Sequence, residues 1–70
     1  MVKTEMLNER IKDSGLKRQY IAEKLGITPL WFTKKIRNEA TFTVTEAAAL
    51  CELLGIRSDA DKAKIFLNNE

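Results

Sequence analysis

The Gly-Ile-Thr-Pro segment that begins at Gly26 constrains the fold of this chain more than any other part of the sequence. Glycine readily adopts the left-handed conformation that commonly follows the last turn of a helix. Two residues later, Thr28 can cap a new helix, and Pro29 suits its first turn because the N–H that proline lacks has no helical partner there. The segment therefore predicts two short helices, at about 18–25 and 29–37, joined by a tight turn.

Other helices are predicted from capping residues and from apolar residues that recur every three or four positions. Thr4 is the expected cap of a first helix whose inner face carries Leu7 and Ile11, after a frayed N-terminus. Thr43 and Glu46 form the Thr-x-x-Glu pattern of a capping box. The sequence thus predicts a single all-α domain, 1–70, a compact bundle of four to five short helices at about 4–14, 18–25, 29–37, 44–54 and 59–68.

Two apolar stripes are expected in the C-terminal half. The stripe of the fourth helix consists of Ala47, Leu50, Cys51 and Leu54. The stripe of the last helix consists of Ala60, Ala63, Phe66 and Leu67. Ile65 completes a run of three apolar residues with Phe66 and Leu67, which is more than a last helix needs for inward packing. Ile65 and Leu67 are therefore candidates for the seam of a homodimer, with packing inside the domain as the alternative.

The composition excludes several classes of site. Cys51 is the only cysteine and histidine is absent, which excludes an internal disulfide, a multi-cysteine zinc site and the common His-based triads. Because Cys51 falls on an apolar stripe, a small core residue is favoured over a redox sensor. No catalytic residue, metal, cofactor or small-molecule substrate is indicated, so an enzyme is not expected. No run approaches the roughly 18 apolar residues of a membrane span and no signal peptide is visible, which favours the cytoplasm.

Charge is distributed unevenly along the chain. Residues 1–40 contain nine Lys/Arg and five Asp/Glu, a net +4, whereas residues 41–70 contain three and five, a net −2. A basic half of this kind is typical of a surface that contacts phosphates, although ordinary solvated charge is the alternative. In the helix predicted at 29–37, the cations Lys34, Lys35 and Arg37 are expected to be exposed.

The segment from Leu16 to Ile56 resembles the Cro/repressor-type (Xre group) helix-turn-helix domains of phage and bacterial regulators. The resemblance covers about residues 4–56 once the first helix is included. The matching features are Ala22 at the helix crossing, Gly26 and Ile27 in the turn, Thr28 as cap, Phe32 in the buried slot of the helix at 29–37, and the closing Leu53-Leu54-Gly55-Ile56. This resemblance implies a lambda-repressor-like fold and a small Cro-like repressor that binds a double-stranded DNA operator in the bacterial cytoplasm or nucleoid, usually as a homodimer.

The resemblance also implies roles for individual residues. The helix at 29–37 is expected to enter the major groove, with Lys34 suited to guanine, Thr33 to several bases and Leu30 to a thymine methyl. The expected base-facing residues are Pro29, Leu30, Thr33 and Lys34. The expected phosphate contacts are Lys17, Arg18, Arg37 and Asn38.

Three departures from the family pattern are visible. Pro29 and Leu30 stand where polar Gln and Ser residues are common, so little hydrogen-bonded base readout is expected from them. Trp31 replaces a small or polar residue, and its ring is expected to pack over the preceding helix or a loop, or else to stack on the DNA backbone. Ile11 and Ile36 occupy the positions of a buried Arg–Glu pair, and we expect them to touch, because apolar contact often replaces such a pair without loss of stability.

A second function class is open from the same residues. Pro29, Leu30 and Trp31 form an apolar run that suits a groove on another protein. The alternative is therefore a protein–protein interaction module on the same fold, antitoxin-like or anti-regulator in kind. The modest net charge of +2 agrees with this alternative.

Overall fold

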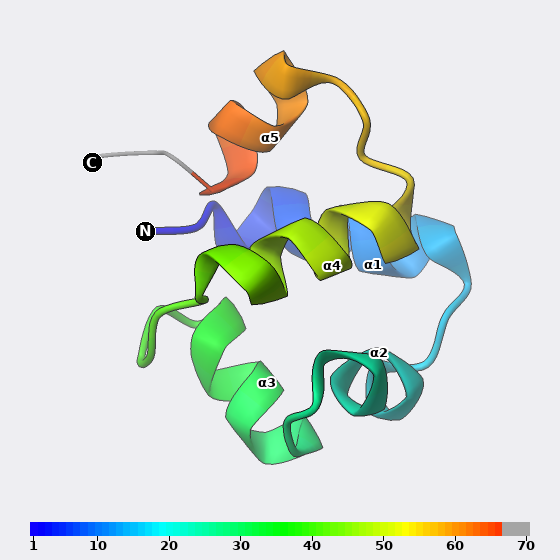
Figure 1. The fold of residues 1–70 in the computed structure, drawn as a ribbon, viewed down its shortest axis with the longest axis vertical. Helices are drawn as coiled ribbons and strands as arrows, with labels where there is room; N and C mark the ends of the chain where they lie inside the picture. Colours follow the sequence, from blue (N-terminus) through cyan, green and yellow to red (C-terminus); the bar gives the residue numbers. More distant parts are fainter. Residues whose placement is uncertain (67–70) are drawn as a thin grey trace.

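Five α-helices make up most of residues 1–66, the part of the chain that the structure, a computed structural model, describes (Figure 1). Their bounds are α1 Thr4–Ser14, α2 Arg18–Leu25, α3 Pro29–Ile36, α4 Val44–Leu54 and α5 Asp59–Phe66. No strand is present in this range, and the predicted all-α bundle is confirmed. The third helix ends one residue earlier than expected, and the predicted end of the last helix lies outside the described residues.

The turn between α2 and α3 has the predicted conformation. Gly26 ends α2 with φ 76°, and the Ile27 N–H donates to the carbonyl of Ala22 at 3.0 Å. The Thr28 hydroxyl oxygen then accepts a hydrogen bond from the Trp31 N–H at 3.1 Å. A left-handed residue followed two positions later by a helix cap fixes the direction in which α3 leaves α2.

Asn38 has two structural roles at the other end of α3. With φ 63° it is left-handed, as predicted, and the next N–H, of Glu39, reaches back to the Lys34 carbonyl at 2.8 Å. Its side-chain amide also pairs with the backbone of Val2: Oδ1 accepts from the N–H at 2.9 Å, and Nδ2 donates to the carbonyl at 3.0 Å. The expected frayed N-terminus is therefore wrong, because Val2 is anchored and only 8% exposed.

The start of α1 also differs from the prediction. Thr4 is the first residue of the helix and not its cap, which is Lys3, without a capping side chain. The Thr4 hydroxyl instead donates to the carbonyl of Ile36 at 2.6 Å, and so it satisfies a carbonyl in the last turn of α3. The side chain that was expected to cap one helix thus links two helices.

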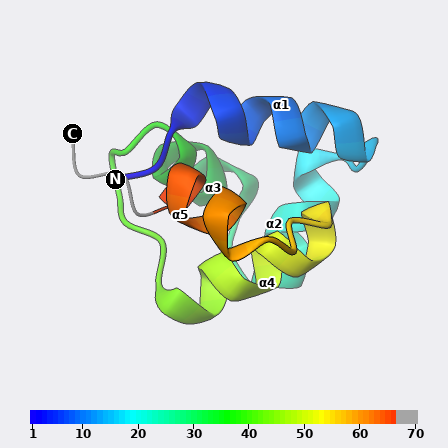
Figure 2. The same cartoon turned by 90° about the horizontal axis from the view of Figure 1, so that it is seen from above.

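One apolar core lies between the helices. α1 packs against α3, α4 and α5, and α2 packs against α3 and α4. Figure 1 shows α5 at one end of the molecule and α2 and α3 at the other, with α1 and α4 between them, and Figure 2, seen from above, shows α5 between α1 and α4. Ile11 and Ile36 are both buried in this core, whereas their direct contact stays a prediction. The buried apolar residues are Val2, Leu7, Ile11, Ile21, Ala22, Phe32, Ile36, Leu50, Cys51, Ile56 and Ile65.

α5 faces the core with only part of the predicted stripe. Phe66 packs against the core as predicted, whereas Ala60 and Ala63 are exposed and Ile65 is fully buried. Two polar contacts accompany this orientation: the Lys3 N–H donates to the Ile65 carbonyl at 2.8 Å, and Arg10 of α1 pairs with Asp61 at 3.2 Å. Ile65 as part of a dimer seam is therefore wrong, because a side chain inside the core cannot contact a second copy. Leu67, the other proposed seam residue, lies outside the described residues.

A buried ion pair links α3 to α4. Lys35, expected to be exposed, is only 5% exposed, and its ammonium donates to the carboxylate of Glu46. The same carboxylate accepts from the Thr43 N–H at 3.0 Å, and so it closes the predicted capping box. The hydrogen bond from Lys35 is the main cause of the lowered pKa of Glu46, followed by the backbone bond from Thr43. One side chain therefore caps α4 and neutralises a buried cation.

Candidate nucleic-acid interface

The side of α3 that faces away from the core carries the residues predicted to face bases. Phe32, Lys35 and Ile36 are buried, at the i, i+3, i+4 spacing of one helix face. On the other side, Pro29 and Leu30 are exposed, and Thr33 and Lys34 are partly exposed. The base-facing set therefore occupies one accessible surface of α3.

A polar hollow lies where α1, α2 and α3 meet. Its volume is about 270 Å³, and its lining residues are Asn8, Arg18, Thr33, Ile36 and Arg37. The structure thus brings together Arg18 and Arg37, predicted as phosphate contacts, and Thr33, predicted as a base contact. Two guanidinium side chains beside the outward side of α3 give this hollow the charge that an anionic ligand requires.

Asn8 belongs to the polar hollow and was not identified from the sequence. Its Oδ1 accepts a hydrogen bond from the Arg18 guanidinium at 2.6 Å. The contact orients Arg18 along the hollow while other N–H groups of the guanidinium remain available, because arginine has five donors. No sequence signal links the two residues, since Asn8 lies next to the buried stripe of α1 and carries no charge.

The remaining predicted phosphate contacts differ in availability. Lys17 is exposed at the start of α2, where no side chain caps the helix. The Arg37 side chain is 68% exposed, with its Nε 3.8 Å from the Glu39 carboxylate. Asn38, in contrast, uses both polar atoms of its side chain to hold Val2. Of the residues predicted to contact phosphates, Lys17, Arg18 and Arg37 thus have exposed cationic side chains.

The tip of α3, Pro29–Trp31, is apolar and accessible. Leu30 is 68% exposed and Trp31 is 45% exposed. The Nζ of Lys34 lies 5.7 Å from the centre of the Trp31 ring, and the Nζ of Lys35 lies at 6.0 Å. Two lysines of the same helix thus lie within cation–π distance of the Trp31 ring.

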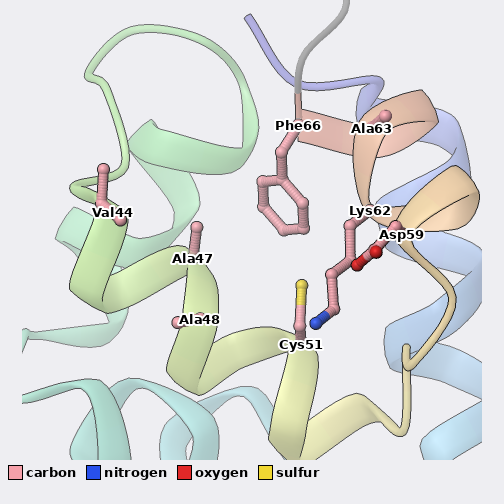
Figure 3. A pocket seen from close by; sticks show the side chains of 8 residues that line it. All are labelled: Val44, Ala47, Ala48, Cys51, Asp59, Lys62, Ala63 and Phe66. Atoms are coloured by element: carbon pink, nitrogen blue, oxygen red, sulfur yellow. The ribbon is translucent and has the colours of Figure 1, made fainter.

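An apolar hollow separates α4 from α5, with a volume of about 560 Å³ (Figure 3). Its lining residues are Val44, Ala47, Ala48, Cys51, Asp59, Lys62, Ala63 and Phe66. One acidic and one basic side chain leave it without net charge, so it does not suit a phosphate. Burial raises the pKa of the Cys51 thiol. The Lys62 ammonium, which Figure 3 shows near the sulfur, partly offsets this rise. A protonated, 3% exposed thiol supports the core role predicted for Cys51.

Other kinds of site receive no support from the described part of the chain. No three potential metal ligands of the His, Cys, Asp or Glu types gather among residues 1–66. No helix in the same range has the length and apolar character needed to cross a membrane. Comparisons with protein-family models, with curated proteins and with solved structures found no match for this chain.

Proposed function

We propose that this protein is a small sequence-specific double-stranded DNA-binding regulator, a Cro-like repressor in which α2 and α3 form the helix-turn-helix. The observation that carries this proposal is the polar hollow, in which Arg18 and Arg37 flank the outward side of α3. A helix with cations on its flanks suits the major groove, which is about 12 Å wide and bordered by phosphates. Repression would follow from occlusion, because a protein bound at an operator blocks polymerase or a competing regulator.

In this proposal the residues divide into two roles. Thr33 and Lys34 contact base edges, since they are the polar side chains on the accessible surface of α3. Lys17, Arg18 and Arg37 contact phosphates and fix the position of α3 in the groove. Asn38 takes no part through its side chain. Affinity is then expected to fall steeply with salt, because each phosphate contact releases counterions from the DNA.

We further propose that two copies bind together, at half-sites about 34 Å apart, as is usual for helix-turn-helix proteins. With Ile65 buried, the apolar hollow is the surface that we assign to the contact between copies. Val44 at its edge is 88% exposed and can enter the hollow of the second copy, where the alanines leave room. Asp59 and Lys62 on the same surface can pair across a two-fold axis, since such an interface is self-complementary. We place this complex in the bacterial cytoplasm or nucleoid.

The tip of α3 supports one alternative function. Leu30 and Trp31 expose apolar surface that a protein groove can bury, as in an antitoxin-like or anti-regulator module. Two substitutions separate the proposals. Lys34→Glu is expected to abolish DNA binding and to spare a protein partner, whereas Trp31→Ala is expected to weaken the protein partner more than DNA.

The experiment that tests the main proposal is a selection from random-sequence DNA duplexes with the full chain. Recovery of a consensus site, followed by salt-dependent binding of that site, is the expected result. The matched control is Lys34→Glu, which retains the exposed surface of α3 but reverses its charge. Failure to enrich any sequence, or an affinity independent of salt, would overturn the proposal.

A further inference from the structure

We propose that Asn8, on α1, is a positioning residue for DNA binding, which holds the Arg18 guanidinium so that Arg18 and Arg37 reach the same phosphate. This inference rests on the proposed DNA-binding function. The proposed DNA contacts lie on or next to α2 and α3, so Asn8 extends the functional surface to a third helix. Two observations carry the inference: the hydrogen bond between Asn8 and Arg18, and the place of both side chains in the lining of the polar hollow.

The partner of Arg18 differs in charge from the partner of Arg37. The Nε of Arg37 lies 3.8 Å from the carboxylate of Glu39. The Nη2 of Arg18 donates instead to the Oδ1 of Asn8, at 2.6 Å, and an amide carries no charge. A carboxylate orders a guanidinium but also offsets the charge that a phosphate would meet, whereas an amide orders it and leaves its charge unchanged.

Arg18 needs such a partner because its own helix does not restrain it. Its side chain is exposed at the first position of α2, where no side chain caps the helix. Fixing a long, exposed side chain on a phosphate costs conformational entropy at the moment of binding. Asn8 is half-buried beside Leu7, which is fully buried in the core, so the folded domain already holds the amide in place. Part of the ordering of Arg18 therefore occurs on folding and not on binding.

The polar hollow brings the two guanidinium groups to one place. Arg18 and Arg37 both line it, and so does Thr33 of α3. A guanidinium has five N–H donors, and the bond to Asn8 uses one donor of Arg18, so the others can reach a phosphate oxygen. Asn8 therefore affects how firmly a phosphate is held, and its effect is expected to be the same for all DNA sequences.

A double-mutant cycle tests the positioning role on the duplex recovered by the selection. Asn8→Ala is expected to weaken binding about fivefold, the order of effect of losing the order of one long side chain. In the Arg18→Ala background, Asn8→Ala is expected to have no further effect, because no guanidinium remains to be positioned. Alanine favours a helix, so Asn8→Ala is expected to stay folded, which circular dichroism verifies.

Replacement of single DNA phosphates by methylphosphonate provides a readout that a purely structural role would not change. The methyl group removes the negative charge of one phosphate and keeps the backbone intact. For the wild type we expect a phosphate at which this replacement weakens binding strongly. In Asn8→Ala and in Arg18→Ala the loss at this phosphate is expected to be smaller, whereas the losses at the other phosphates stay as in the wild type.

Asn8→Asp separates the order of Arg18 from its charge. The carboxylate can still accept the hydrogen bond from Arg18, but it offsets the positive charge. We expect Asn8→Asp to weaken binding more than Asn8→Ala does and to reduce the slope of log affinity against log salt concentration by about one. Asn8→Ala is expected to keep the wild-type slope, because Arg18 can still reach the phosphate.

The outcomes distinguish this inference from the proposed function. Wild-type affinity in a folded Asn8→Ala would overturn the positioning role and leave the proposed function standing. A fivefold loss that persists in the Arg18→Ala background would give Asn8 a DNA contact of its own, and the positioning role would again be wrong. If the selection enriches no duplex, the proposed function fails and this inference fails with it.

Discussion

Replacement of Glu46 by alanine removes one partner of the buried ion pair between α3 and α4. The Lys35 ammonium, whose side chain is only 6% exposed, then has no counter-charge. Breaking a buried pair in this way costs about 3–5 kcal/mol. We expect a value near the lower limit, about 3 kcal/mol, because the Glu46 side chain retains 14% of its exposure and the pair is partly hydrated. Loss of the capping-box contact to the Thr43 N–H adds about 1 kcal/mol.

The total of about 4 kcal/mol is large for this chain. A domain of 70 residues has a free energy of unfolding of about 3.5–10 kcal/mol at the usual value per residue. Urea unfolding followed by far-ultraviolet circular dichroism at pH 7 measures the loss. Glu46→Gln separates the two contributions, because its carbonyl oxygen can still accept from Thr43 while the charge is absent. It is therefore expected to cost about 3 kcal/mol, without the additional capping loss.

A double-mutant cycle tests whether the cost comes from the unpaired lysine. Lys35→Met combined with Glu46→Gln is expected to be more stable than Glu46→Gln alone, because no buried charge remains. A cost of less than about 1 kcal/mol for Glu46→Ala, the value of an exposed pair, would show that the pair does not act as a buried one. A double variant less stable than Glu46→Gln would show that the unpaired lysine is not the source of the cost.

The pKa of Glu46 is lowered in the folded state, so its contribution to stability is present above its ordinary pKa of 4.5 and is lost as the pH falls through the folded-state pKa. Urea midpoints between pH 7 and pH 3 should accordingly fall further for the wild type than for Glu46→Gln, and parallel falls would contradict this. Asn38→Ala removes both hydrogen bonds to Val2 and the residue type that tolerates φ 63°, so we expect it to lower the free energy of unfolding in urea by about 2–3 kcal/mol. Amide exchange at Lys3 should also be accelerated in this variant, and unchanged exchange would argue against anchoring of Val2 by Asn38. Arg18→Ala is expected to weaken binding to all duplexes about equally and to reduce the slope of log affinity against log salt concentration by about one. An unchanged slope in a salt titration would show that Arg18 does not contact a phosphate. Val44→Asp places a charge in the apolar hollow, at a first-turn position where an acid favours the helix, so helical content should be retained. Sedimentation velocity should then show a smaller dimer fraction than for the wild type, and an unchanged dimer fraction would place the contact between copies elsewhere.

The parts of the fold that the sequence predicts well depend on local chemistry. Gly26, Thr28 and Thr43 have the predicted roles because a left-handed residue or a helix cap involves groups only a few positions apart. The accessible side of α3 was also predictable, since the apolar positions of a short helix determine its buried face. Helical periodicity therefore placed Thr33 and Lys34 on the exposed surface.

The features that the sequence did not predict are contacts between distant parts of the chain. Lys35 lies three residues after Phe32, on the buried face, yet lysine is almost never buried without a partner, and its partner is on the next helix. Asn38 meets Val2 across 36 positions, for which no spacing rule exists. In α5 the fully buried residue is Ile65, with more apolar surface than Ala60 or Ala63, and the contacts of this helix with Lys3 and Arg10 lie more than 50 positions away in the sequence. The place of Asn8 in the polar hollow was likewise not predictable, because it depends on a contact with Arg18 on another helix.

The contacts made by the first three residues also determine how the domain comes apart. Helices shorter than about 12–15 residues are marginal in isolation, and α5 has only eight residues in the described range. Its carbonyl at Ile65 accepts from Lys3, while Val2 is fixed to the end of α3 by Asn38. Detachment of residues 1–3 would therefore remove a contact of α5 and a contact of the end of α3 at the same time. We therefore expect the beginning and the end of the described chain to open together, so that a protease cut near residue 3 also increases cleavage near residue 65.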